Sequence, residues 1–498
     1  MNVNPITRLD YPDPDVIRVE DTYYMVSTTM HFMPGCEILQ SFDLVHWEHV
    51  TYVYETLDHT DAQQLKSGQN IYGQGMWAAS LCYHEGRFYI CFVANDTRKT
   101  YLYTSEKIDG PWKKQLIEGF YHDGSLLFDE DGRNYIVYGN DEIWITELNE
   151  DLTAPKKDGL HRLLVSDHKN PELGYEGSHI QKINGYYYIF LIHSLRDRWM
   201  RTEACFYSDS LEGEFTGGDV LCDDRGYCGQ GVAQGGIVDT PDGKWYAMLF
   251  QDSGAVGRIP ILLPVTWKDH FPFFGQNGHV PEEIEVHSTR PGYIYQPLVG
   301  SDDFCNGLLP RWQFNHDPDP RYYHLDALQG TYTITTREVC TELTQAVNTL
   351  TQRMSYPSCA AEVTVDASAL KEGDVAGLCA LQSCYAAVGI IKHHGKYEVL
   401  MLDKKEDGIL DMTEGTVVES HQMDFRLEAD FCNMKDEARC YYRVNKGDWL
   451  PIGTVHKLYF KLDHFTGCRF GLFCYAAEET GGSACFRDFK YYDVDEIS

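Results

Sequence analysis

A turn-centred pattern that recurs five times in the first 250 residues constrains the fold of this chain more than any other feature. In each copy a short apolar run leads into a turn with Gly or Asp, and an aromatic-rich run then ends on Tyr. The copies are residues 15–24, 80–89, 126–135, 179–188 and 237–246. In the last four, the turn contains Glu-Gly, Asp-Gly or Asn-Gly, which is typical of β-hairpins because primed turns need positive φ.

The spacing of the copies predicts the architecture. The closing tyrosines lie 46 to 65 residues apart, which fits a blade built from four short strands. Five such units indicate an all-β, five-bladed β-propeller over residues 1–295, in which radial repetition protects the sheet edges. The alternative is a two-sheet sandwich whose hairpins recur by coincidence.

Charge and cysteine content exclude several classes of partner and site. The 498 residues include 42 basic and 75 acidic side chains, and the net charge of −33 would repel nucleic acid and anionic membranes. No run reaches the roughly 18 apolar residues of a membrane helix. The 16 cysteines are scattered without zinc-like spacing. Residues 1–5 lack the features of a secretory signal, so we expect reduced thiols and a cytoplasmic location.

One residue stands at the start of each hairpin, 12 positions before the closing Tyr in the last four copies and 11 before it in the first. These blade-start residues are Asp13, Trp77, Asp123, Glu176 and Gln234. The first strand of each hairpin is the inner strand of its blade, so we expect the five side chains to meet in one pocket on the propeller axis. Three carboxylates in one pocket push their pKa values apart, which separates an acid from a base. The alternative is that these carboxylates cap turns, a common role of Asp.

Motifs around these residues form an ordered set. They are Asn4-Pro-Ile, Tyr11-Pro-Asp-Pro, Ser41-Phe-Asp-Leu-Val-His-Trp, Gly75-Met-Trp-Ala, His122-Asp-Gly-Ser-Leu and Glu176-Gly-Ser-His. In order and spacing, over about the first 290 residues, this set resembles glycoside hydrolase family 43. That family contains β-xylosidases, α-L-arabinofuranosidases and some endo-arabinanases.

The resemblance implies a five-bladed propeller with an inverting mechanism and assigns roles by position. Asp13 matches the general base, Glu176 the general acid, and Asp123 the residue that orients the acid and modulates its pKa. Inverting hydrolysis needs the base and the acid on opposite sides of the sugar, roughly 6.5–9.5 Å apart, so that a water molecule fits. Because Asp123 would place a second carboxylate beside Glu176, we expect the pKa of Glu176 to be raised.

Further residues are candidates for sugar binding. Phe32 and Trp77 resemble residues that wall the pocket in exo-acting members, and packing at a blade edge is the alternative. Arg258 resembles an arginine that binds sugar hydroxyls, and it could equally balance the charge of the carboxylates. His193 follows the fourth hairpin and is expected to orient the pocket. Gln234 stands where many members have a His near an axial calcium ion or water cluster, so an axial calcium is in doubt, although an amide carbonyl can coordinate one.

The pattern changes after the propeller, and residues 300–498 predict a second domain. Alternating runs at sandwich-like spacing indicate strands at residues 330–336, 361–366, 397–402 and 458–462. The segment resembles the concanavalin-like C-terminal domain of family 43 β-xylosidases, and that likeness is carried by residues 312–316, 348–353 and 373–378. By resemblance this β-sandwich packs on the propeller and closes the pocket, which favours removal of one terminal sugar.

The second domain also contains a candidate metal site. Asp302 or Asp303, together with Asp488, would join the first and last strands of the sandwich through a structural calcium ion. The alternative is that these residues are ordinary turn carboxylates. No cofactor is required for the chemistry itself.

The sequence therefore predicts an exo-acting inverting glycoside hydrolase that releases terminal pentose from hemicellulose-derived oligosaccharides. A β-1,4-D-xylosidase is the first choice, and an α-L-arabinofuranosidase or a bifunctional enzyme is the alternative. The expected partner is a neutral xylo- or arabino-xylooligosaccharide, and a homo-oligomer is left open. Two rival hypotheses are a carbohydrate-binding propeller without catalysis and a retaining, fructan-type hydrolase, which also has five blades.

Overall fold

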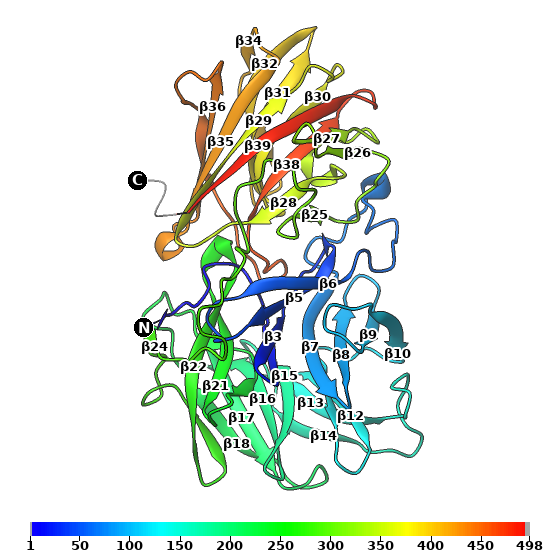
Figure 1. The fold of residues 1–498 in the computed structure, drawn as a ribbon, viewed down its shortest axis with the longest axis vertical. Helices are drawn as coiled ribbons and strands as arrows, with labels where there is room; N and C mark the ends of the chain where they lie inside the picture. The colour runs from blue at the N-terminus through cyan, green and yellow to red at the C-terminus, as the bar shows by residue number, and fades with distance from the viewer. Residues whose placement is uncertain (1, 494–498) are drawn as a thin grey trace.

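The computed structural model describes residues 2–493, which form two β-rich domains stacked along the long axis of the molecule (Figure 1). Met1 and residues 494–498, the ends of the two predicted domains, lie outside the described residues. Among residues 2–493, helical structure is confined to single turns, which are η1 (Lys66–Gly68), η2 (Gly254–Val256), η3 (Leu343–Gln345) and η4 (Cys432–Met434). Within the described part of the chain, no helix has the length and apolar character needed to cross a membrane.

The first domain is a five-bladed β-propeller, as predicted, and each blade is an antiparallel sheet. Blade 1 contains β2 (Asp15–Val19), β3 (Thr22–Val26), β5 (Gly35–Ser41) and β6 (Glu48–Tyr54). Blade 2 contains β7 (Met76–His84), β8 (Arg87–Ala94), β9 (Lys99–Ser105) and β10 (Lys113–Ile117). Blade 3 contains β11 (Ser125–Phe128), β12 (Asn134–Asn140), β13 (Glu142–Leu148) and β14 (His161–Ser166).

The remaining two blades complete the ring. Blade 4 contains β15 (Glu176–Ile183), β16 (Tyr186–Ser194), β17 (Arg201–Ser208) and β18 (Thr216–Leu221). Blade 5 contains β19 (Val232–Ala233), β20 (Ile237–Asp239), β21 (Trp245–Asp252), β22 (Arg258–Lys268) and β23 (Phe271–Phe274). A short pair, β1 (Asn2–Val3) with β24 (Glu283–Ile284), joins the beginning of the domain to its end.

The predicted hairpins are the innermost strand pairs of the five blades. The closing tyrosine of each copy pairs with the first strand of its own hairpin, as Tyr24 does with Ile17 and Tyr135 with Leu127. The turn glycines Gly86, Gly132 and Gly185 have φ values of 79°, 82° and 84°, the positive values that the turn sequences require. The hairpin prediction is therefore confirmed, and the two-sheet alternative for this half of the chain is wrong.

The propeller core lies between blades rather than in one centre. Cys91 and Leu102 of blade 2 pack against Ile136 of blade 3, and Val137 on the other face of β12 packs against Ile189 of blade 4. Successive residues of a strand point to opposite faces, so each blade is apolar on both sides. The polar ends of the inner strands are left at the axis, where the pocket forms.

The second domain is a sandwich of two antiparallel sheets. The larger sheet contains β33 (Leu410–Met412), β34 (Thr416–Val418), β32 (Lys396–Lys404), β31 (Tyr385–His393), β30 (Asp374–Leu381), β38 (Arg469–Ala476), β28 (Leu350–Arg353), β25 (Gln313–Asn315) and β4 (Phe32–Met33). The other contains β26 (Tyr323–Asp326), β27 (Thr331–Thr335), β39 (Ser483–Asp493), β29 (Ser358–Asp366), β35 (Gln422–Asp430), β36 (Glu437–Val444) and β37 (Leu450–Lys457). The predicted strands at residues 330–336, 361–366 and 397–402 correspond to β27, β29 and β32.

The two domains share a sheet and buried charges. Strand β4 lies between β3 and β5 in sequence, yet it pairs with β25 of the sandwich. Arg353 of the sandwich is buried and forms an ion pair of 2.8 Å with Glu37 of blade 1. A buried charge pair is costly to separate, so the sandwich is a fixed wall of the propeller.

Candidate functional site

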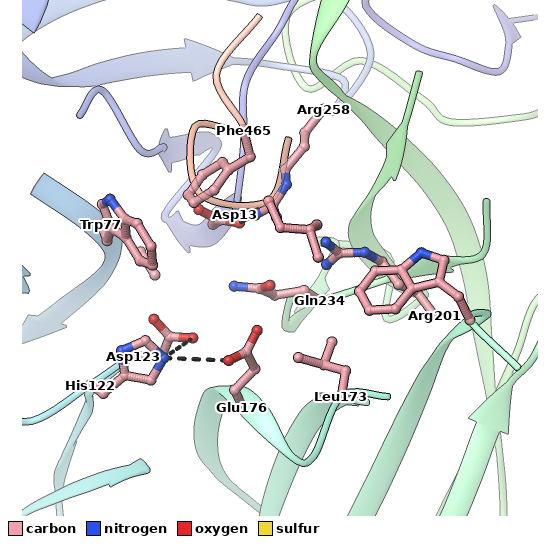
Figure 2. Close-up of a pocket in the computed structure, with 13 residues that line it drawn as sticks. Asp13, Trp77, His122, Asp123, Leu173, Glu176, Arg201, Gln234, Arg258 and Phe465 are labelled. Carbon is pink, nitrogen blue, oxygen red and sulfur yellow. Dashed lines mark hydrogen bonds and ion pairs between the residues drawn. The ribbon is translucent and has the colours of Figure 1, made fainter. Parts of the chain in front are cut away.

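All five blade-start residues line one pocket of about 180 Å³ at the end of the propeller axis (Figure 2). The convergence predicted from the repeat is therefore present in the structure. The other residues that line the pocket are Ala78, His122, Leu173, Trp199, Arg201, Arg258, Leu462 and Phe465. The last two come from the sandwich domain.

Left-handed backbone directs the blade-start residues toward the axis. Asp13, Asp123 and Gln234 have φ values of 52°, 48° and 61°. In the other two blades the following residue has the positive φ, which is 38° at Ala78 and 63° at Gly177. Such conformations cost on the order of 1–3 kcal/mol for residues other than glycine and cluster at functional sites. At Gly177 a side chain is also excluded by space, because a Cβ atom would lie 2.7 Å from Cδ of Gln234.

Asp13 is held by two donors at the bottom of the pocket. Thr28 Oγ1 donates to Asp13 Oδ2 at 2.5 Å, and Arg258 Nη1 donates to Asp13 Oδ1 at 2.5 Å. Arg258 is held in turn by Asp252, which also forms an ion pair of 2.9 Å with the buried Arg201. The arginine predicted to bind sugar hydroxyls therefore also balances charge, so both interpretations of Arg258 describe contacts that it can make.

Asp123, Glu176 and His122 form a second group across the pocket. His122 Nε2 lies 3.4 Å from Glu176 Oε2 and 3.5 Å from Asp123 Oδ2. Asn140 Nδ2 donates to Glu176 Oε2 at 2.7 Å, and the backbone N–H of Gly177 donates to Asp123 Oδ2 at 2.9 Å. Each of the two carboxyl groups thus has its own fixed donor, and the imidazole lies between them (Figure 2).

The raised pKa lies on Asp123, whereas the sequence predicts it on Glu176. Burial raises the pKa of Asp123 to about 6, and the charges of Glu176 and Asp13 add to that effect against His122. Burial also favours a raised pKa of Glu176, but the hydrogen bond and charge of His122, with Arg201 and Arg258, lower it below its ordinary value. The expectation failed because it counted the neighbouring carboxylate and omitted the imidazole, whose own pKa these carboxylates raise to about 9 despite burial.

Replacing His122 by Gln is expected to extend activity to higher pH. Glu176 must hold a proton to act as an acid, and removing a positive charge 3.4 Å away raises its pKa, so a larger fraction stays protonated. The alkaline limb of kcat/KM against pH should move upward by about one unit. The exposed His287, replaced by Gln, is the control. An alkaline limb that stays in place or moves downward would contradict the effect of His122 on Glu176.

The sandwich domain contributes the upper wall of the pocket. The segment 458–468, here called the sandwich loop, follows β37 and is not the strand that the sequence predicts. Its Phe465 is buried, its ring centre lies 3.7 Å from the guanidinium carbon of Arg258, and it packs edge-on against Trp77 at 5.0 Å. Of the alternating residues, Leu458 is buried in the sandwich core and Leu462 lines the pocket.

Asp10 connects the sandwich loop to the group that holds Asp13. Its Oδ1 accepts the backbone N–H of Arg258 at 2.7 Å, and its Oδ2 accepts that of Gly467 at 2.8 Å. The approach is close enough that a Cβ on Gly257 would lie 2.1 Å from Asp10 Oδ1. The carboxylate of Asp10 therefore fixes both Arg258, which holds Asp13, and the sandwich loop.

Replacing Asp10 by Asn is expected to lower kcat/KM by about tenfold or more. The amide NH₂ would face one of the two backbone N–H groups, and losing a hydrogen bond to a charged acceptor costs roughly 1.5–3 kcal/mol. Steady-state kinetics on an aryl glycoside measures the loss. Asp21→Asn, which removes an exposed carboxylate paired with Arg290, is the matched control. A kcat/KM within twofold of the wild-type value would show that Asp10 does not position the pocket.

Two predicted pocket residues lie elsewhere, and the first is Phe32. This residue is buried in β4, where it pairs with Asn315 of the sandwich and its ring lies 3.4 Å from the guanidinium carbon of Arg469. It is not among the residues that line the pocket, because its strand has joined the sandwich sheet. Phe465 provides the aromatic wall instead, from a part of the chain that the propeller repeat does not include.

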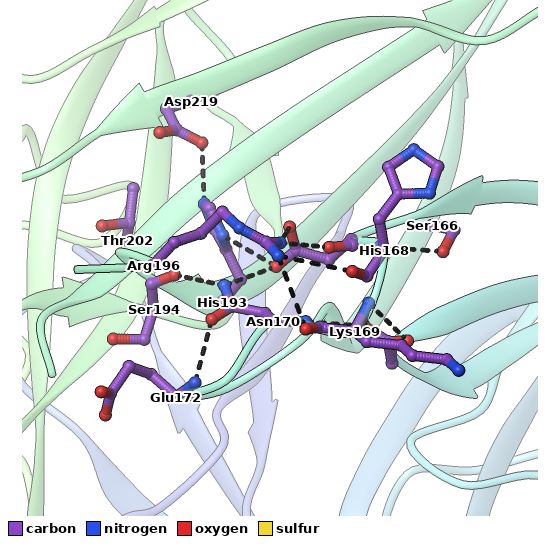
Figure 3. Close-up of polar contacts among 12 residues, drawn as sticks. Ser166, His168, Lys169, Asn170, Glu172, His193, Ser194, Arg196, Thr202 and Asp219 are labelled. Carbon is purple, nitrogen blue, oxygen red and sulfur yellow. Dashed lines mark hydrogen bonds and ion pairs between the residues drawn. The ribbon is translucent and has the colours of Figure 1, made fainter. Parts of the chain in front are cut away.

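His193 is also outside the pocket and braces two loops that line it (Figure 3). Its Nδ1 lies 3.2 Å from Asp167 and its Nε2 lies 2.8 Å from Asp219. The loop after Asp167 carries Leu173, and the loop after His193 carries Trp199, and both of these side chains line the pocket. The structure therefore connects His193 to the pocket through these loops, and its role in orienting the pocket stays a prediction.

The predicted metal residues do not form a cluster. Among residues 2–493, the three-residue group whose donor atoms lie within 4.8 Å of one another is His122, Asp123 and Glu176, in the catalytic pocket. Neither Asp303 nor Asp488 belongs to such a group. Asp302 already accepts from Trp312 Nε1 at 2.8 Å and from the backbone of Phe304 at 2.7 Å, so its oxygens serve the fold. A structural calcium at these residues stays a prediction, and no step of the chemistry below uses one.

Several lining residues could not be found from the repeat. His122 directly precedes Asp123 in the motif His122-Asp-Gly-Ser-Leu, and this adjacency to a pocket carboxylate is the sequence signal that could have identified it. Arg201 begins β17, the third strand of blade 4, and Trp199 lies in the loop just before it. The repeat predicts only residues at the start of the first strand of each blade, so it does not indicate these two. Phe465 is separated from Asp13 by most of the chain and by a domain boundary, and nothing local in its sequence indicates a pocket.

Comparisons with known proteins bear on the family. The model of glycosyl hydrolases family 43 matches residues 3–272, and that of the β-xylosidase C-terminal concanavalin A-like domain matches residues 301–492. A β-xylosidase from Formosa agariphila is 26% identical over 99% of this chain and 89% of its own length.

Solved structures share the whole fold. A bifunctional GH43-CE protein from Bacteroides eggerthii is 42% identical with a TM-score of 0.91, over 99% of this chain, which spans 63% of that protein. A family 43 glycoside hydrolase engineered to display both endo-xylanase and exo-arabinofuranosidase activity is 27% identical over 99% of both chains, with a TM-score of 0.88. Since the family model covers more than half of the sequence and solved members share both domains, the chain belongs to glycosyl hydrolases family 43, a family of inverting glycosidases.

Proposed function

We propose that the chain is an exo-acting β-1,4-D-xylosidase that removes a terminal xylose from neutral xylo-oligosaccharides. The observation that carries the proposal is the pocket of about 180 Å³, which is lined by three carboxylates and closed on one side by Phe465 and Leu462 of the sandwich loop. This volume is below the roughly 300–1,000 Å³ of sites for drug-sized ligands and suits one sugar ring. The β-xylosidase type of the C-terminal domain and the Formosa agariphila relative support xylose as that sugar.

The residues support a single displacement. Asp13 takes a proton from a water molecule whose oxygen attacks the anomeric carbon, while the bond from that carbon to the leaving oxygen breaks. Glu176 gives its proton to the leaving oxygen, so the released sugar has the inverted configuration. Asp13 ends protonated and Glu176 ionised, and proton exchange with solvent restores both. Thr28 and Arg258 hold the base in place at 2.5 Å each.

Asp123 and His122 support the acid in this mechanism. Asp123, whose pKa burial raises to about 6, accepts the backbone N–H of Gly177 at 2.9 Å and so fixes the residue that follows Glu176. His122 lies within 3.5 Å of both carboxyl groups and stabilises Glu176 as an anion after the proton has left.

A second candidate activity is that of an α-L-arabinofuranosidase. It is favoured by the engineered relative that displays exo-arabinofuranosidase activity. That protein is 27% identical to this chain, and the match covers 99% of it. A panel of nitrophenyl β-D-xyloside, nitrophenyl α-L-arabinofuranoside, xylobiose and arabino-xylooligosaccharides tests both. We expect the highest kcat/KM on the xylosides. A preference for arabinofuranosides would favour the second candidate, and no turnover of any substrate would favour a binding propeller without catalysis.

A further inference from the structure

A second cavity lies between blade 5, the N-terminal segment and the sandwich. Its volume is about 270 Å³, and it is lined by Asn4, Pro5, Arg225, Tyr227, Gln251, Ser253, Ile259, Ile261 and Tyr356. Tyr356 belongs to the sandwich, and the other residues belong to the propeller. None of these residues lines the catalytic pocket, so the two sites are separate.

The two cavities share the walls formed by β21 and β22. Successive residues of these strands point to opposite faces, and the catalytic pocket receives Arg258 while the second cavity receives Ile259 and Ile261. In the same way Asp252 holds the catalytic arginines, and its neighbour Gln251 faces the second cavity. The second cavity therefore lies behind the strands that carry the base-holding group.

Arg225 is the charged group of this cavity, and it forms no ion pair within the described residues. Its Nη1 donates to Gln251 Oε1 at 3.1 Å, and its Nη2 donates to the carbonyl oxygen of Asn4 at 3.0 Å. A guanidinium has five N–H donors, so three of them have no protein acceptor here. Burial lowers the pKa of Arg225, against the charges of Asp223 and Glu282.

The acidic residues nearest to Arg225 are engaged by other groups or stand apart. Asp223 Oδ2 accepts the backbone N–H of Val280 at 2.7 Å, and its Oδ1 accepts the backbone N–H of Arg225 at 3.1 Å. The carboxylate of Asp224 accepts two backbone N–H groups of its own turn. Glu282 is exposed and makes no ion pair with the arginine. In a chain with a net charge of −33, a half-buried cation without a carboxylate partner is an unusual arrangement.

We propose that this cavity binds a small anionic ligand of sugar size, with its carboxylate or phosphate group on the Arg225 guanidinium. The free edge of a guanidinium matches these groups with two parallel hydrogen bonds. Tyr227 and Tyr356, whose rings lie 6.3 Å apart in an edge-to-face arrangement, form one wall. Ile259 and Ile261 are buried behind the polar groups of the cavity.

Calorimetric titration tests the proposal with glucuronate and inorganic phosphate as probes and with glucose and xylose as neutral controls. We expect at least one of the two anions to bind the wild-type protein, and Arg225→Gln to weaken that binding at least tenfold. Arg133→Gln removes the same charge from an exposed hairpin turn, where Arg133 pairs with Asp131, and should leave binding unchanged. Tighter binding of glucuronate would identify a sugar acid as the ligand class, and tighter binding of phosphate would identify a phosphorylated one.

A second variant separates recognition from folding. Arg225→Lys keeps the positive charge but loses the pair of parallel N–H donors of the guanidinium. It should therefore bind the anion more weakly than wild type and more tightly than Arg225→Gln. If Arg225→Gln does not fold, the comparison of Arg225→Lys with wild type decides. Failure of both anions to bind the wild-type protein, or equal binding by wild type and the Arg225 variants, would overturn the proposal.

Discussion

Asp13→Asn is expected to lower kcat by about 10²–10⁴-fold, with a similar loss on every substrate. The amide has the size of the carboxylate. With its oxygen toward Arg258 it still accepts that hydrogen bond, and its NH₂ can donate to the hydroxyl oxygen of Thr28, so the fold should persist. It cannot take a proton from water, however, and the single displacement needs that proton transfer whatever the leaving group is. Steady-state rates on nitrophenyl xyloside and xylobiose measure the effect.

The control for this variant is a buried carboxylate outside the pocket that has a structural role. Asp129 accepts from Lys182 at 2.6 Å and from Tyr187 at 2.6 Å, away from the pocket, and Asp129→Asn should alter stability more than turnover. If Asp13→Asn retained more than a tenth of the wild-type kcat, Asp13 would not be the base. A loss confined to one leaving group would also contradict this role, because it would indicate an acid.

Glu176→Gln is expected to show a loss that depends on the leaving group. Xylobiose has a poor leaving group and needs the proton, so its kcat should fall by about 10²–10⁴-fold. A nitrophenyl leaving group departs without protonation, so the loss on the aryl xyloside should be far smaller. Gln keeps an acceptor for Asn140, which lies 2.7 Å from Glu176 Oε2, and the geometry is therefore preserved.

The comparison between substrates decides the role of Glu176. Both rates are measured on the same preparation, so any loss of folded protein cancels in their ratio. Equal losses on xylobiose and the aryl xyloside would show that Glu176 is not the acid. In that case Asp123, the carboxyl group with the raised pKa, would be the alternative donor, and Asp123→Asn should then show the leaving-group dependence.

Much of the propeller could be predicted from the sequence because its information is local and repeated. The turn of each hairpin is encoded by its own residues, as Gly132 with its φ of 82° illustrates. Five copies of the hairpin indicate five blades. The same period places Asp13, Asp123 and Glu176 at equivalent points of different blades. Equivalent positions at the start of the inner strands all face the propeller axis. The pocket can therefore be predicted without knowledge of any long-range contact.

The remainder of the site depends on contacts that cross blades or domains. Phe32 looks like a pocket aromatic in sequence, but pairing with Asn315 draws it into the sandwich. Residues 458–462 alternate like a strand, yet the segment leaves the sheet and brings Leu462 to the pocket. Local pattern conflicts with the final structure where function requires it, and the sandwich loop is such a place.

The pKa of Glu176 shows the same limit in electrostatic terms. A like charge beside a carboxylate raises its pKa, and this part of the argument is sound for Asp123. The sign reversed at Glu176 because His122, one residue before Asp123, turns its ring between both carboxyl groups at 3.4 and 3.5 Å. The spacing of residues does not show which way a side chain points inside a turn, and that direction decides whether the pKa of each carboxyl group is raised or lowered.

Proton NMR during hydrolysis of xylobiose tests the inverting mechanism most directly. The β-linked xylose at the non-reducing end should appear first as the α-anomer and should reach the equilibrium mixture only by later mutarotation. This result requires a water molecule activated by Asp13 on the face opposite Glu176. Release of xylose first as the β-anomer would contradict it, because retention needs a covalent intermediate on a nucleophilic carboxylate.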